Sequence, residues 1–488
     1  MSTCQYGLGT VTQLVAKGAH DDYLTVGASI TFWRFKHMKH TNFALETSCQ
    51  QWNAGGNSVG QKASLRINRQ GDLVYWMYVV LRLPGLANIN SNPNSGNHGH
   101  VIVENDEECM RYGPSWDTTP ATDGQNGATQ IPRWTNSVGQ HLTREVSVTI
   151  GGQVIDTLTN DFMFIWEELS GKTGKRLTEM TLKSNSMELL QHWSMFSRCL
   201  YVPLPFFFTM TSGTVLPLVS LQFHDVKLYA EFGHIEDSIV NYCAQHEGVC
   251  TRTVARQESN GASLAPITSS SRFDDINNNH ISTSLEVCYV YLDVDERAKF
   301  AEGTFEMLVT QVQTFRQTTT QASNNLRLDF NHAVIELIWF IRHSSATDAN
   351  DHFNFSGVAE PITQANRDPL KSATLRLNNQ MRFGGKDVPA CWYRLVAPYQ
   401  HHSSIPESFV YVYSFALFPE DPQPTGTLNF SRIDNATLSL ELDPNLFNDN
   451  TGSGGVDSSS HSAEIVVFAR NYNVLRFAQG LAGLAYAN

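Results

Sequence analysis

The stretch that decides the fold is VSVTIGGQV, residues 146–154. Val146, Val148 and Ile150 alternate with polar residues, which is the period of a β-strand that has one buried face. The pair Gly151-Gly152 then permits the tight turn that joins two antiparallel strands. The stretch therefore predicts a β-hairpin.

The same pattern occurs again as ATLRLNNQM, residues 373–381, where Asn378-Asn379 replaces the two glycines of the turn. Two further pairs of segments match in the same order along the chain. The strand from Arg66 to Arg82 matches that from Arg327 to Arg342, and the turn Ser212-Gly213-Thr214 matches Thr425-Gly426-Thr427. Three ordered matches indicate an internal duplication.

The separation between matched positions shrinks from 261 to 227 to 213 residues, so the first half contains extra residues. We assign these to residues 86–137, a stretch rich in Gly, Asn, Ser, Pro and Thr that is typical of a long functional insertion. Between the two halves, the stretch Ser259–Ser284 is rich in Ser, Asn and Asp, as domain boundaries are. The predicted layout is an N-terminal segment 1–30, a first β domain 31–232, a linker 233–283, a second β domain 284–470 and a C-terminal segment 471–488.

Alternation with a period of two recurs over most of the chain, so the expected fold class is all-β with a few short helices. Short helices are expected over residues 161–169 and 186–198 and in the last turns after Asn473. The alternation within residues 221–232 slips by one position at His224-Asp225, which predicts a β-bulge there.

The composition indicates large buried cores and an acidic chain. Hydrophobic residues make up 41% of the sequence and charged residues 17%, below the ~25% of an average soluble domain. The low charged fraction suggests that other protein covers much of the surface. The formal net charge of −13 opposes contact with phosphates, so no direct nucleic acid binding is expected. The run from Lys17 to His40 is a local basic exception.

Cysteines and apolar stretches favour synthesis in the cytosol. The N-terminus has no basic start followed by an apolar run, so no signal peptide is expected. The longest apolar stretches, Leu73–Leu83 and Leu200–Phe208, are interrupted by Arg82 and Pro203 and are too short to span a membrane. The eight cysteines are scattered without a C-x-x-C pair, as free thiols would be: Cys4, Cys49, Cys109, Cys199, Cys243, Cys250, Cys288 and Cys391.

The sequence lacks a motif with the spacing of a catalytic or cofactor site. Gly171-Lys172-Thr173 resembles the end of a phosphate-binding loop, but Trp166 stands where that loop requires glycine. Adjacent acids such as Glu167-Glu168 and Asp274-Asp275 need not converge on one substrate. We therefore expect no catalytic residues and no cofactor.

The histidines that could bind a metal lie in stretches without fixed spacing. His98 and His100 lie near several acids and Cys109 within the insertion, where a solvated polar loop is favoured over a metal site. The pair His401-His402 is likewise interpreted as part of a loop. No metal site is expected.

Long segments in both halves carry a family signature. They are LTVGASITFWRFKHMKHTNFALE (Leu24–Glu46), LYVPLPFFFTMTSGTVLPLVSLQFHDVKL (Leu200–Leu228), YSFALFPEDPQPTGTLNFSRIDNATLSL (Tyr413–Leu440) and ARNYNVLRFAQGLAGLAYAN (Ala469–Asn488). Together they resemble the major capsid proteins of nucleocytoplasmic large DNA viruses, the iridovirus, phycodnavirus and mimivirus relatives. Residues 86–137 and 240–281 match no motif of that family.

The resemblance implies two tandem eight-stranded jelly-roll β-sandwiches in a structural protein that is not an enzyme. Three chains would form a homotrimer with a pseudo-hexagonal outline that tiles an icosahedral virion shell. The implied partners are the chain itself, neighbouring capsomers, and minor capsid and penton proteins. Residues 1–30 would lie beneath the capsomer, where they could contact an internal membrane, and the insertion would project outward. The implied localisation is the virion capsid, assembled in the host cytoplasm.

Two other function classes stay open at this point. A jelly-roll carbohydrate-binding protein would expose aromatic side chains on a concave face, whereas most aromatic residues here fall within strand patterns. A glycan-processing amidase with two adjacent jelly rolls would need convergent acids in a cleft between its domains, and no such pair stands out in the sequence.

Overall fold

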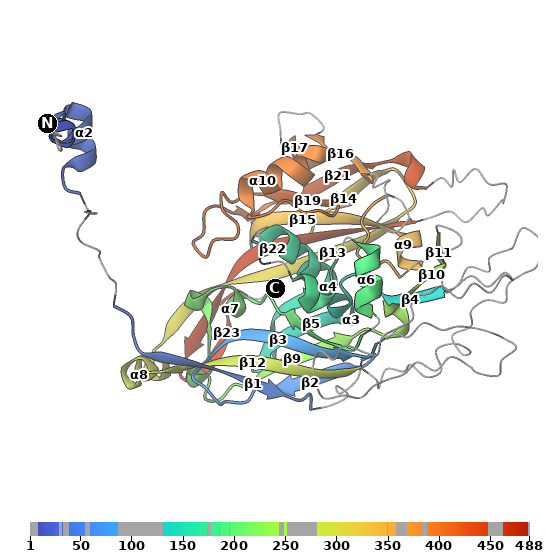
Figure 1. The fold of residues 1–488 in the computed structure, drawn as a ribbon, viewed down its shortest axis with the longest axis horizontal. Coiled ribbons are helices and arrows are strands. Elements are labelled where there is room, and N and C mark those ends of the chain that lie inside the picture. The colour runs from blue at the N-terminus through green and yellow to red at the C-terminus, as the bar shows by residue number, and fades with distance from the viewer. Residues whose placement is uncertain are drawn as a thin grey trace, which may run out of the picture. The chain divides into compact units, whose positions relative to one another are not determined.

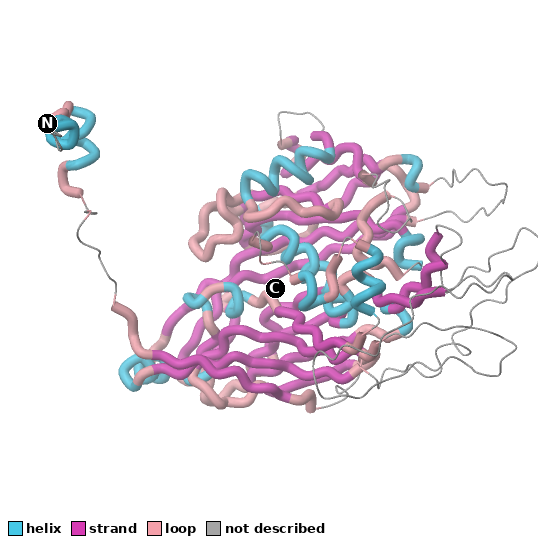
Figure 2. Tube along the Cα trace, in the orientation of Figure 1, coloured by secondary structure: helices cyan, strands magenta, loops and turns pink. Residues whose placement is uncertain are grey.

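Two sets of β-sheets account for most of the computed structural model (Figure 1). The chain forms two compact units, Met1–Phe43 and Ala44–Asn488, and both sets of sheets belong to the second unit. Strands dominate the trace, with short helices between them (Figure 2). The structure describes residues 8–28, 32, 39–53, 59–85, 130–172, 175, 177–184, 186–194, 196–243, 248–250, 281–348, 350–357, 368–382, 388–447 and 462–486.

The first β-sandwich combines a five-stranded and a four-stranded sheet. Buried apolar residues from both sheets belong to one hydrophobic core. The five-stranded sheet has the order β1 (Phe43–Gln50), β12 (Ser282–Leu292), β3 (Leu73–Leu83) and β7 (Arg198–Pro203), and β8 (Leu216–Pro217) also pairs with β3. The four-stranded sheet has the order β2 (Lys62–Arg66), β9 (Val226–Phe232), β5 (Thr143–Ile150) and β6 (Gln153–Thr159).

The second β-sandwich repeats this strand order. Its first sheet has the order β13 (Phe305–Thr319), β22 (Ala463–Ala478), β15 (Ala333–His343) and β19 (Val410–Ser414), with β20 (Leu428–Asn429) on β15 and β23 (Leu481–Leu484) on β22. Its second sheet has the order β14 (Ser323–Arg327), β21 (Ala436–Leu442), β16 (Leu370–Leu377) and β17 (Gln380–Met381), with β18 (Val388–Pro389) on β16. Each of the nine strands of the first sandwich thus has a counterpart in the second sandwich, which confirms the duplication.

The two hairpins that predicted the duplication have matching turns. Strands β5 and β6 join through Gly151 and Gly152, with φ angles of +59° and +89°. Strands β16 and β17 join through Asn378 and Asn379, with φ angles of +48° and +64°. Positive φ at both central residues is the geometry of the two-residue hairpin turn that glycine and asparagine favour.

Strand β12 differs from the predicted layout. The second domain was expected to begin at residue 284, but residues 282–290 pair with β3 in the first sandwich. The chain must return to the first sandwich to fill the gap between β1 and β3, a requirement that no local pattern reveals. The second sandwich therefore begins after β12, with helix α8 (Val294–Glu302) leading into β13. Most of the expected linker, and residues 86–129 of the insertion, lie outside the described residues.

A small third sheet lies next to the end of the insertion. Strand β4 (Gln130–Trp134) pairs with β10 (Ile239–Cys243), which in turn pairs with β11 (Gly248–Cys250). Two segments that matched no family motif thus meet in one sheet.

Two local expectations were wrong. The last turns after Asn473 are strand, because β22 continues to Ala478 and β23 folds back on it. The expected C-terminal segment is therefore part of the second sandwich. The expected bulge at His224-Asp225 is absent, because β9 begins only at Val226 and the residues before it form a loop.

The helices are short, and two of them confirm expectations. Helix α4 (Asn160–Ser170) corresponds to the expected residues 161–169, and α6 (Met187–Ser194) lies within 186–198. The other α-helices are α1 (Leu8–Val15), α2 (Ala19–Thr25), α3 (Val138–Leu142), α5 (Thr178–Thr181), α7 (Phe207–Met210), α9 (Ser344–Asp348) and α10 (Ala397–His401). A π-helix, η6 (Trp392–Val396), precedes α10, and 3-10 turns occupy η1 (Ser212–Thr214), η2 (Leu218–Ser220), η3 (Glu236–Ser238), η7 (Phe430–Arg432) and η8 (Pro444–Leu446).

Candidate functional site at the junction of the two sandwiches

Helix α4 of the first sandwich packs against the second sandwich. Its start is fixed by Thr159, whose hydroxyl accepts a hydrogen bond from the Phe162 backbone N–H at 3.4 Å. The apolar run that follows leaves no α4 residue exposed. The Phe162 ring meets that of Phe468 on β22 edge-to-face, with centroids 5.6 Å apart. This helix therefore forms the centre of the junction.

A buried carboxylate at the start of α4 binds two arginines of the second sandwich. Asp161 is 1% exposed, and its Oδ2 lies 2.8 Å from Arg316 Nη2. Its Oδ1 accepts a hydrogen bond from Arg342. Glu464 binds the same two guanidinium groups, at 3.0 Å from Arg316 and 3.4 Å from Arg342. The four charges balance, so the cluster holds α4 on the second sandwich without an unpaired ion.

A second ion cluster surrounds Glu336 of β15. Its Oε2 lies 2.8 Å from His402 Nε2, and its Oε1 lies 3.3 Å from Arg470 Nη1. The other ring nitrogen of His402 lies 3.0 Å from Glu420 Oε1. The Arg470 guanidinium also lies 4.2 Å from the ring centroid of Trp166, which brings α4 into this cluster.

The charges of this second cluster are mutually stabilised. Burial alone would lower the pKa of His402, but Glu336 and Glu420 raise it to about 9. Burial alone would raise the pKa of Glu336, but His402 and Arg470 lower it overall. The imidazolium and the carboxylate are therefore both charged at neutral pH, and each ring nitrogen of His402 donates a hydrogen bond.

Polar contacts also join the neighbouring strands β6 and β13. Asp156 accepts a hydrogen bond from the Val312 backbone N–H at 3.2 Å, and Gln311 donates to the Ile155 carbonyl. Asn473 in turn donates to Gln311 at 2.8 Å. Burial raises the pKa of Asp156 to about 7 despite these bonds. The edge of the first sandwich is thus tied to β13 by both backbone and side chains.

Two buried histidines meet across the same junction. The rings of His141 on α3 and His352 stack with centroids 4.0 Å apart and an angle of 10°. Burial lowers the pKa of both, that of His352 to about 4, so both rings are neutral at pH 7. His352 Nε2 lies 3.0 Å from the Asp237 carbonyl and donates to it. The pair acts as an apolar stacked contact.

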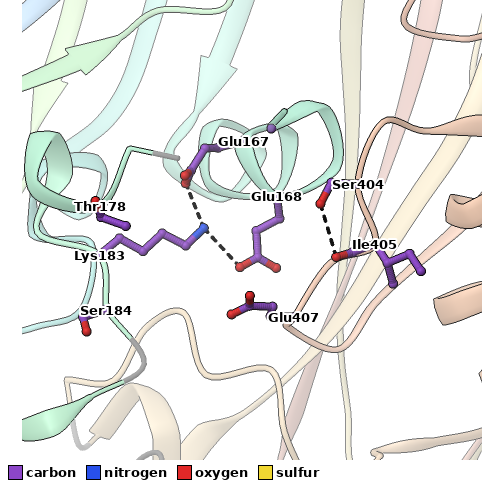
Figure 3. A pocket seen from close by; sticks show the side chains of 9 residues that line it. Glu167, Glu168, Thr178, Lys183, Ser184, Ser404, Ile405 and Glu407 are labelled. Carbon is purple, nitrogen blue, oxygen red and sulfur yellow. Dashed lines mark hydrogen bonds and ion pairs between the residues drawn. The ribbon is translucent and has the colours of Figure 1, made fainter. Parts of the chain in front are cut away.

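The adjacent acids Glu167-Glu168 converge on a lysine (Figure 3). Lys183 Nζ lies 2.8 Å from Glu167 and 3.1 Å from Glu168, beside a cavity of about 70 Å³. Glu168 also accepts a hydrogen bond from the Ser408 backbone N–H of the second sandwich at 3.0 Å. Both carboxylates are therefore engaged in ion pairs and hydrogen bonds that stabilise the junction.

Other residues considered from the sequence lie apart from this junction or outside the described residues. Lys172 is exposed, and Thr173 is not described. Neither Asp274-Asp275 nor the histidines and acids of the insertion fall within the described residues: His98, His100, Glu104, Glu107, Glu108 and Cys109. Within the described part of the chain, no group of three or more His, Cys, Asp or Glu side chains could hold a metal ion. In that same part, no helix has the length and apolar character needed to cross a membrane.

The sequence did not predict the ion clusters of the junction. His401-His402 was interpreted as a loop pair, whereas His402 is fully buried between Glu336 and Glu420. These partners are 66 and 18 residues away along the chain, so no spacing rule could have joined them. The signal that was available is a charged residue, Glu336, in the middle of the apolar run from Ala333 to Ile341.

The arrangement favours a structural role over a chemical one. The buried charges of the Asp161 cluster are paired with one another, and the residues that form these pairs come from both sandwiches. Breaking such a pair leaves an uncompensated buried charge, so the two sandwiches are expected to stay together as one body.

Comparisons with known proteins match the whole length of the two sandwiches. A family model described as "Major capsid protein N-terminus" matches residues 31–293, and one described as "Large eukaryotic DNA virus major capsid protein" matches residues 296–483. The major capsid proteins of Pyramimonas orientalis virus and Paramecium bursaria Chlorella virus 1 are each 32% identical, over 98% of this chain and 100% of their own length.

Solved structures give the same result. A structure described as "PBCV-1 virus capsid, quasi-atomic model" matches with a TM-score of 0.65 and 28% identity, over 94% of this chain and 100% of that chain. The Faustovirus major capsid protein has the same fold, with a TM-score of 0.64 at 11% identity over 96% of each chain. The two family models meet between residues 293 and 296, which agrees with the place of β12 in the first sandwich.

Proposed function

The chain belongs to the major capsid protein family of large eukaryotic DNA viruses, and from that premise we propose that it forms homotrimeric capsomers with a pseudo-hexagonal outline. As a capsid protein it is a component of the virion shell, and it associates with copies of itself. Family membership favours this function over the carbohydrate-binding and amidase alternatives.

The observation that carries the proposal is the repetition of one strand order in two sandwiches of a single chain. Each sandwich would form one lobe, so three copies would supply six lobes of similar shape, although the true symmetry is threefold. Six similar lobes can tile a hexagonal lattice through heterologous contacts at their edges. The ion pairs of Asp161 support this reading, because they fix the two lobes of each chain relative to each other.

Light scattering on the purified chain tests the proposal, together with negative-stain images of the same peak. We expect a particle of three times 54.5 kDa with a hexagonal outline. A monomer that forms no trimer at any concentration would contradict the proposal.

The segment before the first sandwich fits contact with other components of the shell. Helices α1 and α2 expose large apolar side chains, with Leu14 72%, Val15 75% and Tyr23 90% exposed. The surrounding run from Lys17 to His40 is basic in sequence. We propose that this segment lies beneath the capsomer and binds minor capsid proteins or the anionic headgroups of an internal membrane.

Deleting residues 1–30 should leave trimers intact but reduce the yield of closed shells. Residues 44–488 form a compact unit of their own, so their folding should not depend on the deleted part. The measurement is trimer mass by light scattering and particle yield by electron microscopy. A full-length Leu14→Ser variant serves as the control that keeps the chain length and the charge while reducing the apolar surface. Loss of folding upon deletion would count against this placement.

Further aspects of the proposal follow from the family. Penton proteins and neighbouring capsomers would bind the lateral edges, and assembly would take place in the host cytoplasm. The insertion at 86–137 would project outward from the shell. We propose no catalytic role, since the acids of the junction are held in ion pairs with Lys183, His402 and the arginines.

A further inference from the structure

The outer face of β15 is covered within the chain. Glu336, Ile338, Phe340 and Arg342 alternate along this face, and none is more than 9% exposed. Helix α4 lies over it, because Asp161 binds Arg342 and the α4 aromatic rings contact β22 and Arg470. Strand β15 is therefore buried on both faces.

The corresponding face of the first sandwich is left partly uncovered. Strand β3 pairs with β8 at Leu73 and Val74, just as β15 pairs with β20 at Ala333 and Val334, which fixes the correspondence between the two strands. The counterparts of the four buried residues are then Trp76, Tyr78, Val80 and Arg82. Of these, Trp76 is 40% exposed, Arg82 is exposed and Tyr78 is partly exposed, whereas only Val80 is buried. We name Trp76, Tyr78 and Arg82 the sheet face.

The sheet face borders a hollow of about 360 Å³. One wall includes Trp76, Tyr78, Pro203 and Met210, and the opposite wall is formed by α4 and the segment after it, including Trp166 and Lys172. The equivalent place on the second sandwich, beside Glu336, is occupied by Trp166 of α4 through its contacts with Arg470 and His402. The first sandwich thus has space where the second has a packed aromatic side chain.

The helical segment that corresponds to α4 also has an uncovered side. Helix α4 lies between β6 and β7, and η6 with α10 lies at the same place in the second sandwich, between β18 and β19. Its inner side is packed, since Tyr393 and Ala397 are 0% exposed. Its outer side exposes Leu395, Val396 and Tyr399, the last at 76%. We name these three residues the helix face.

We infer that the sheet face of one copy binds the helix face of a second copy, and that this contact repeats between chains what α4 does within one chain. This inference rests on the proposed trimer and names its contact surfaces. Each chain has one sheet face and one helix face left over after its internal junction forms. The contact is therefore heterologous, and a rotation that closes it produces a ring.

Large exposed apolar side chains support a protein partner at both faces. We take the partner to be a second copy of this chain. Within one chain, the outer face of β15 already binds a helix of the other sandwich, α4, so the equivalent face of β3 suits the equivalent helix of another copy. The exposed Arg82, whose counterpart Arg342 binds a carboxylate, is suited to the polar rim of such a contact.

Mixing two variants tests the pairing of the faces. Trp76→Asp removes the sheet face and Tyr399→Asp removes the helix face, and each variant alone should lose the trimer peak. An equal mixture should form a species of two chains, because one intact sheet face and one intact helix face remain, but it cannot close a ring. Sedimentation velocity measures the mass, and near-ultraviolet circular dichroism checks that each variant is folded. Phe223→Asp is the matched control, since Phe223 is 75% exposed and belongs to neither face, and it should stay trimeric.

The outcomes separate this inference from the proposed function. If the unmodified chain is trimeric and both variants remain trimeric, the assignment of the faces is wrong and the trimer stands. If both variants dissociate but their mixture stays monomeric up to the solubility limit, the pairing of these two faces is overturned. If the unmodified chain never forms trimers, the proposed function itself fails. Should Trp76→Asp fail to fold, Arg82→Glu replaces it in the same mixture.

Discussion

Replacing Asp161 by alanine is expected to lower the free energy of unfolding by about 3 kcal/mol, toward the lower end of the range for breaking a buried ion pair. The substitution leaves Arg342, whose side chain is 10% exposed, without its closest carboxylate. Glu464 remains near both arginines, which limits the loss. Equilibrium unfolding in urea measures the change.

The matched control is Asp329→Ala. Asp329 binds Arg327 at 2.9 Å, but both side chains are at least 70% exposed. An exposed pair of this kind contributes about 1 kcal/mol or less. Equal losses for the two variants would show that the Asp161 cluster does not stabilise the junction.

Replacing His402 by glutamine should destabilise the protein at pH 7 and also change its response to pH. The substitution removes the cation between the buried Glu336 and the partly buried Glu420, so a loss of about 3 kcal/mol is expected at neutral pH. The folded pKa of about 9 lies above the ordinary value of 6.5, so the folded state binds this proton more tightly than the unfolded chain. The stability that His402 contributes is therefore fully present below pH 6.5 and is lost as the pH rises through 9.

The difference in unfolding free energy between the original chain and His402→Gln measures this effect, because the titrating groups outside this cluster are common to both. The difference should be largest near pH 6 and should shrink as the pH passes about 9. His401→Gln is the control, since His401 lies next in sequence but its ring bonds to the Leu417 carbonyl at the surface. A difference that is constant from pH 6 to pH 10 would contradict the charged state of His402.

Local patterns predicted the features that depend on neighbours in sequence. The paired turn residues Gly151-Gly152 and Asn378-Asn379 and the alternation around them were sufficient to find the duplicated hairpins. Helix α4 (Asn160–Ser170) was predicted over residues 161–169, close to its bounds in the structure. Strand β12 was placed in the wrong half, because its partner β3 lies about two hundred residues earlier and no local signal points to it.

The sequence pointed to individual residues of the junction but not to the contacts between them. Glu167-Glu168 and His402 were noticed as residues, but their ion partners come from distant strands and loops. Asp161 gave no signal of its own, since an acid in the first turn of a helix is common. The packing of the two sandwiches decides which charged side chains pair. That packing depends on the whole chain and not on residues that are close in sequence.

The place of β12 has a consequence for synthesis. It is a central strand of the first sandwich, flanked by β1 and β3, yet it begins only at Ser282. A nascent chain cannot complete this sheet until the ribosome has released residues through Leu292, so the first sandwich does not finish folding before the second begins to emerge. The edges of β1 and β3 stay unpaired during that interval, when they can pair wrongly with other chains. Slow translation or a chaperone that covers these two strands would therefore affect the yield of native protein more than its final stability.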